Sequence, residues 1–145
     1  MNNSFHFVRL CWFTMSSEAV VQQKTRLEFA KIGVMWRNNV GACEDATGRL
    51  IRYGLGNDSA QLNREIKSSD LIGITPVTAY VASLARWTTL GVFTALEVKA
   101  SDWRFTPGDE RAIAQAKFHD IVKAAGGYAG FVVDPTNIDQ IIRRL

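Results

Sequence analysis

A run of apolar and β-branched residues at positions 92–100 constrains the fold of this chain more than any other stretch. The run is typical of a buried β-strand that begins after Gly91. Glu97 and Lys99 interrupt it near its C-terminal end. Because side chains two apart on a strand point to the same face, both charges leave the sheet side by side. Burial of charge without a partner is costly, so these residues form either an ion pair at a strand end or part of a site.

The pattern around this strand predicts one domain of the α/β class, since 145 residues suffice for a single core but not for two. The order of elements is α-β-β-β-α-β-α, which indicates a mixed β-sheet flanked by helices. The strands at 92–100 and 128–133 are joined by a helix, so we expect them to pair in parallel. The expected helices cover 16–31, 106–125 and 138–144, with a short one within 59–67, and the other expected strands cover 34–37, 48–54 and 70–74.

Local signals set the expected ends of these elements. We expect Pro76 to stop the strand at 70–74, while 78–89 suits a hairpin or a short helix equally. Thr106 followed by Pro107 predicts the start of the long helix. In the first helix, the predicted apolar face holds Val20, Leu27 and Ala30.

Composition is that of an ordinary soluble protein. The net charge of +3 and the pI of about 9.1 are compatible with a nucleic-acid partner without arguing for one. Cys11 and Cys43 have no metal-site spacing, which favours free thiols in a reducing cytosol. No apolar run approaches the ~20 residues of a membrane span, so we expect a cytoplasmic protein with no membrane partner and no organic cofactor. Residues 1–14 are interpreted as an N-terminal extension peripheral to a domain at 15–145, the alternative being an edge strand at 6–10.

Asp70 opens one strand as Glu97 ends another. If the two strands are antiparallel neighbours, both carboxylates meet within reach of one divalent cation. Mg²⁺ or Mn²⁺ favours such oxygen ligands, and the backbone carbonyl of Val98 is a further candidate. Lys99 would then stabilise charge on a phosphate or orient the attacking water. Glu18, at the start of the first helix, is a candidate third carboxylate.

These segments resemble the PD-(D/E)XK nuclease superfamily and, more closely, the stand-alone virus-type replication-repair nuclease (VRR-NUC) family. The resemblance covers about residues 15–145 and rests on the order and spacing of several short segments. These are Glu18, 34–41, Ser69-Asp70-Leu71-Ile72-Gly73, Leu96-Glu97-Val98-Lys99, Gln115 with Phe118, and the strand that follows Gly126-Gly127.

The resemblance implies a Mg²⁺- or Mn²⁺-dependent DNA endonuclease that hydrolyses phosphodiester bonds. It implies branched DNA such as Holliday junctions as substrate, a setting in phage replication or recombination inside the host cytoplasm, and a homodimer. The implied catalytic residues are Glu18, Asp70, Glu97, Lys99 and Gln115, of which Asp70, Glu97, Val98 and Glu18 would hold the metal.

Each assignment has a simpler alternative. Glu18 also suits the helix dipole, and Gln115 also suits a solvated helix face. Arg37, Asn38 and Asn39 are expected to contact the DNA backbone, although exposed turn residues would look the same.

Two departures from the family pattern matter. Asp58 follows a glycine-rich loop and is a rival to Asp70, which is preferred because it opens an apolar strand, and 57–68 then looks like an insertion. The segment at 76–90 is longer than a hairpin turn needs, and is expected to be a surface for DNA or a second subunit. Two other functions stay open: a non-catalytic DNA-binding or assembly module on a nuclease-like fold, and a restriction-type nuclease, for which no recognition domain is visible.

Overall fold

The computed structural model describes residues 16–142, so the predictions for 1–14 and for the last residues of the C-terminal helix lie outside it. Its helices are α1 (Glu18–Phe29), α2 (Ala60–Glu65), α3 (Glu110–Ala124) and α4 (Ile138–Ile142), with 3-10 turns η1 (Ala82–Leu84) and η2 (Pro135–Asn137). Its strands are β1 (Val34–Arg37), β2 (Gly41–Glu44), β3 (Leu50–Tyr53), β4 (Leu71–Val81), β5 (Arg86–Val98) and β6 (Tyr128–Val132). Within this part of the chain, no helix has the length and apolar content needed to cross a membrane.

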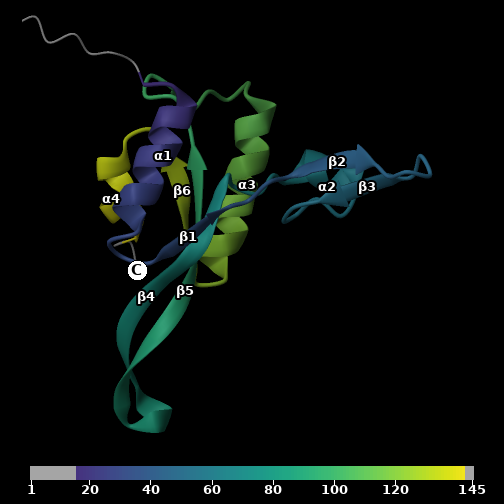
Figure 1. Ribbon diagram of the computed structural model, residues 1–145. Helices are drawn as coiled ribbons and strands as arrows, with labels where there is room; N and C mark the ends of the chain where they lie inside the picture. The colour runs from purple at the N-terminus through teal and green to yellow at the C-terminus, as the bar shows by residue number, and fades with distance from the viewer. Residues whose placement is uncertain (1–15, 143–145) are drawn as a thin grey trace, which may run out of the picture.

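A four-stranded sheet in the order β1-β4-β5-β6 forms the centre of the molecule. Its strands pair antiparallel except for β5 and β6, which run parallel and are joined through α3. Helices α1 and α4 cover one face and α3 covers the other (Figure 1). The predicted mixed sheet flanked by helices and the predicted parallel pair are therefore confirmed.

Two apolar clusters hold the helices to the sheet. Leu96 and Val98 of β5 belong to the cluster under α1 and α4, whereas Ala95 belongs to the cluster under α3. Because side chains alternate along a strand, Glu97 and Lys99 lie on the α3 face with Ala95. The first helix differs from the prediction: it buries its other face, and Val20 and Leu27 are exposed. The buried residues of α1 are Val21, Thr25 and Phe29.

The strands β4 and β5 continue past the body of the protein as a long two-stranded ribbon (Figure 1). This overturns the expectation that Pro76 ends its strand, since Pro76 pairs with Gly91 inside the ribbon. The partner β1 reaches only as far as Ile74, so beyond that residue no strand within 16–142 pairs with this edge of β4. Proline is tolerated there because its missing N–H breaks no ladder on the free edge. The ambiguous segment at 78–89 is thus a hairpin.

A side lobe made of β2, β3 and α2 projects from the body on the side of α3 (Figure 1). The strand expected at 48–54 is present as β3, but it pairs with β2 in a separate two-stranded sheet and not with the main sheet. Asn57 holds this lobe together from a buried position. Its Nδ2 donates to the carbonyl oxygens of Gly41 (2.6 Å) and Tyr53 (2.9 Å), which lie at facing ends of the two strands. The side lobe therefore begins well before 57–68, the segment that was expected to be an insertion.

Candidate metal and phosphodiester site

The register of β4 and β5 brings two carboxylates together at the end of the sheet. Leu71 pairs with Leu96, so Asp70 and Glu97 come next along the two antiparallel strands. The N–H of Asp70 donates to Glu97 Oε2 (3.1 Å), and the N–H of Val98 donates to Asp70 Oδ2 (3.1 Å). Each carboxylate is thus fixed by the backbone of the opposite strand. The antiparallel arrangement expected for Asp70 and Glu97 is the one that the structure has.

A buried polar network fixes the lysine beside them. Lys99 Nζ donates to Glu97 Oε1 (3.0 Å) and to Gln115 Oε1 (2.9 Å), while Gln115 Nε2 donates to Glu97 Oε1. All three side chains are buried, Glu97 completely. Gln115 comes from α3, which lies over the face of β5 that carries the two charges. A lysine ammonium has three N–H donors, and the described residues accept two of those of Lys99. The third donor is available for a ligand.

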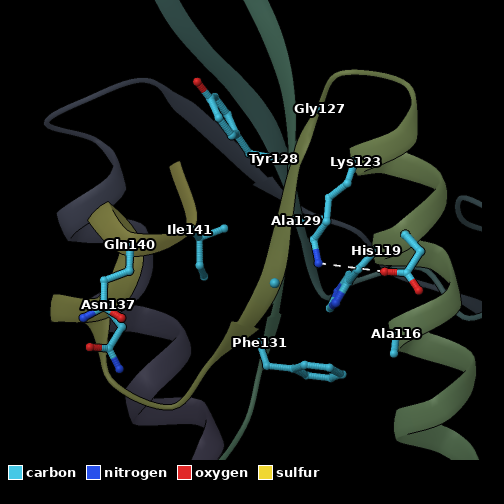
Figure 2. A pocket seen from close by; sticks show the side chains of 12 residues that line it. Ala116, His119, Lys123, Gly127, Tyr128, Ala129, Phe131, Asn137, Gln140 and Ile141 are labelled. Carbon is cyan, nitrogen blue, oxygen red and sulfur yellow. Dashed lines mark ion pairs between the residues drawn. The ribbon is translucent and has the colours of Figure 1, made fainter. Parts of the chain in front are cut away.

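Aromatic rings close the far side of this network. Lys99 Nζ lies 5.7 Å from the ring centre of Trp103 and 5.9 Å from that of Phe131, distances at which a ring face attracts a cation. Phe131 also packs edge-on against His119, with ring centres 4.7 Å apart. Figure 2 shows His119 and Phe131 side by side between α3 and β6, next to a hollow of about 570 Å³. His119 Nε2 bonds Ser69 Oγ (2.9 Å), which holds the chain just before Asp70.

The electrostatics of the site follow from burial. Loss of solvent, and then the negative charge of Asp70, raise the pKa of Glu97 to about 7, with Lys99 acting in the opposite direction. Burial, and then the charge of Lys123, lower the pKa of His119 to about 4. His119 is therefore neutral near pH 7, and its contacts are those of a packed and hydrogen-bonded core histidine.

Oxygen atoms suitable for a hard cation remain at this end of the sheet. Asp70 Oδ1 accepts no hydrogen bond from the described residues, and Glu97 Oε2 accepts one. The carbonyl of Val98 lies between Glu97 and Lys99 in the chain. Among residues 16–142, however, no three or more His, Cys, Asp or Glu side chains gather as a metal site. The site thus offers two carboxylates, with a backbone carbonyl as the further protein ligand.

Glu18 is not grouped with these two carboxylates, contrary to the prediction of a third acidic ligand. It occupies the first turn of α1 and is exposed. Gln22, one turn further along the same helix face, instead lines a hollow together with Asp70. Gln22 follows Glu18 by four residues, and this helical spacing in the sequence indicates that both lie on one helix face. Gln22 was not among the predicted site residues, because carboxylates were the expected ligands.

The three predicted DNA contacts differ in how free their side chains are. Asn38 donates through Nδ2 to Ser68 Oγ (2.8 Å) and to the carbonyl of Ser69 (2.9 Å), so both of its N–H groups serve the protein itself. Arg37 and Asn39 are exposed and line the hollow that holds Gln22 and Asp70.

The rival acid Asp58 is exposed in the side lobe. It lines a different hollow, with Arg49 and Arg52, that contains neither Asp70 nor Glu97. The structure thus places Asp70, and not Asp58, beside Glu97.

In comparisons with known proteins, no protein-family model, curated protein or solved structure matches this chain.

Proposed function

We propose that this protein is a metal-dependent DNA endonuclease with a PD-(D/E)XK-like fold. The observation that carries the proposal is the pairing of Asp70 with Glu97 across two neighbouring strands, with Lys99 on the same face as Glu97. A buried carboxylate with a raised pKa beside a second acid is unusual in a purely structural role. Gln115, which joins both Glu97 and Lys99, makes the arrangement a four-residue site.

The donor set suits Mg²⁺ or Mn²⁺, which favour carboxylate and carbonyl oxygens. Asp70, Glu97 and the Val98 carbonyl would hold the ion, with water completing its ligands. Repulsion from Asp70 contributes to the raised pKa of Glu97, and a divalent cation between the two groups would relieve that repulsion. Bound there, the ion supplies positive charge that offsets the negative charge developing on the phosphate.

The protein side chains then have separate tasks. Lys99 directs its remaining N–H at a phosphate oxygen or at the attacking water, because Glu97 and Gln115 hold its other two donors. Gln115 acts through Lys99 and Glu97, and is therefore a positioning residue. Trp103 and Phe131 keep water away from the lysine stem. Arg37 and Asn39, beside Asp70, are placed to contact the DNA backbone.

The ribbon formed by β4 and β5 is the proposed contact between two copies in a homodimer. Between positions 71 and 96 the chain has one charged residue, Arg86, so the ribbon lacks the cations that a DNA contact requires. Ile74, Tyr80, Trp87 and Phe93 are exposed on its surface. In a symmetric dimer the same patch faces itself, and an apolar strip whose single charge is Arg86 does so with little like-charge repulsion.

The rival function is a DNA-binding module without catalysis. A cleavage assay on duplex, flap and four-way-junction DNA separates the two. We expect cutting with Mg²⁺ or Mn²⁺, strongest on branched DNA, and none in EDTA. Lys99→Ala and Glu97→Ala should each lower the rate by on the order of 100-fold or more. Lys24→Ala, which removes an exposed lysine of α1, is the matched control. Metal-independent binding without cutting would favour the rival function, and cutting that survives both substitutions would sink the proposed site.

A further inference from the structure

A hollow of about 320 Å³ adjoins the candidate site on the side of the lobe. Asp70 and Gln115 are part of its wall, and so are three cationic residues from three different segments. Arg52 comes from β3, Lys67 from the segment after α2, and Arg111 from the first turn of α3. We call this set the cationic hollow.

No ion pair among residues 16–142 neutralises the positive charge of the hollow. The ion pairs in the described part of the chain involve Lys31, Lys99 and Lys123, and none of the three cations of the hollow. Asp70 is the single acidic side chain in the wall. Three cations next to one carboxylate leave an excess of positive charge at a concave surface, where it attracts anions more strongly than on an open surface.

Two of the cations are held in place by neutral side chains. Arg52 Nη1 donates to Oδ1 of the buried Asn57 (3.1 Å), and Lys67 Nζ donates to Asn63 Oδ1 (2.8 Å). The backbone N–H of Lys67 also bonds the carbonyl of Ala114 in α3 (3.1 Å). Each cation is thus oriented without losing its charge, and most of its N–H donors stay available.

Arg and Lys make many of the hydrogen bonds that proteins donate to DNA phosphates, and three cations gathered in one hollow favour the anionic backbone over a neutral base edge. The hollow shares Asp70 with the site that would hold the phosphate to be cut. We propose that Arg52, Lys67 and Arg111 bind a neighbouring phosphate of the same DNA strand, an inference that rests on the proposed nuclease function. In this arrangement the side lobe and the segment that follows it contribute Arg52 and Lys67. These cations position the DNA strand relative to Asp70.

The test is DNA binding in the Lys99→Ala background with Mg²⁺ present, so that the DNA stays intact. The probe is a fluorescein-labelled four-way junction, titrated over a range of salt concentrations. Arg111→Gln and Lys67→Gln should each weaken binding by about tenfold to 100-fold and reduce the slope of log K against log salt by about 1. Arg64→Gln and Lys117→Gln remove exposed charges that lie outside the hollow, and should change neither quantity.

Several outcomes would overturn the inference. Unchanged affinity and salt slope in both hollow variants would do so, even if the wild-type protein cuts DNA and the proposed function stands. Absence of DNA binding, or displacement of the DNA by inorganic phosphate as readily as by unlabelled DNA, would also contradict it. If the hollow variants lose binding as expected but the wild-type protein cuts nothing, the phosphate contact stands while the proposed nuclease activity fails. Arg111→Lys, which keeps the charge, should recover most of the affinity.

Discussion

The carboxyl group of Glu97 carries its charge in a place from which solvent is excluded. Its partners are Lys99, Gln115 and the backbone N–H of Asp70, all fixed by secondary structure. A buried charge that keeps such partners costs less than an isolated one, but the nearby Asp70 still makes ionisation unfavourable. A cation that binds both carboxylates would relieve this unfavourable free energy, and the relief would add to its binding.

This cost should appear as a pH dependence of stability. Folding raises the pKa of Glu97 from 4.5 to about 7. The stability that its protonated carboxyl contributes is therefore complete below pH 4.5 and is lost as pH rises through about 7. Relative to wild type, the free energy of unfolding of Glu97→Gln in EDTA should therefore rise by about 3 kcal/mol between about pH 4 and pH 8. Urea unfolding at several pH values measures this, with the exposed Glu28→Gln as control. Parallel pH profiles for the wild-type protein and Glu97→Gln would show that folding does not raise the pKa of Glu97.

The choice between two aspartates is also a question about single residues. Asp70 touches the backbone of β5 beside Glu97, whereas Asp58 lies in the side lobe. Asp70→Asn should lower the rate of DNA cleavage by on the order of 100-fold or more, because it removes the charge of a proposed metal ligand. Asp58→Asn makes the same change of charge and should leave the rate unaltered. A larger loss in Asp58→Asn than in Asp70→Asn would reverse the assignment.

At the scale of elements, sequence signals placed most helices and strands, but they gave no strand for β2 and misplaced several element ends. The predicted start of α3 was wrong: Thr106 closes a turn onto Asp109, and Asp109 is the N-cap. Thr106 and Asp109 are both residue types that cap helices, and they lie three positions apart. The sequence alone does not distinguish between them. The face of α1 was misjudged for a similar reason. Thr25 and Phe29 are buried because α1 packs against β1 and β5, not because of their polarity.

The caps of α1 and α3 allow a matched comparison. Asp109 accepts a hydrogen bond from the N–H of Ala112 (2.9 Å), whereas the side chain of Ser17 at the start of α1 makes no such bond. Asp109→Ala should lower the free energy of unfolding by about 1 kcal/mol, since an unsatisfied helix N–H remains. Ser17→Ala should change it much less. Urea denaturation of both variants gives the difference, and equal losses would mean that the hydrogen bond accepted by Asp109 adds nothing to stability.

At the scale of the whole molecule, the ribbon and the side lobe extend in different directions from one small sheet (Figure 1). The lobe adds cations beside Asp70, and the ribbon adds an apolar surface with one charged residue, Arg86, far from it. Tyr80 and Trp87 pair across the ribbon near its tip, with ring centres 5.8 Å apart, and both rings are exposed. An exposed pair of rings on an arm with a single charged residue is typical of a protein contact.

If two ribbons meet in the dimer, their aromatic pair should be needed for it. The double variant Tyr80→Ser with Trp87→Ser should elute as a monomer where the wild-type protein elutes as a dimer, because it removes the largest apolar side chains from the proposed interface. Size-exclusion chromatography with light scattering measures the mass directly. Leu27→Ser removes an equally exposed apolar residue from α1 and should leave the dimer intact. A monomeric wild-type protein would contradict the proposed dimer.

The sequence by itself determined the strand that carries Glu97 and Lys99, and the face they share, since alternation along a strand is a local property. It also favoured Asp70 over Asp58 as the acid that opens an apolar strand, and it predicted the parallel pairing of β5 with β6. Only the tertiary structure decided that Gln115 closes the network, that Glu18 stays apart from it, and that Arg52 and Arg111 share one hollow. Those relations join segments far apart in the chain, and depend on how helices pack on the sheet, which no local pattern encodes.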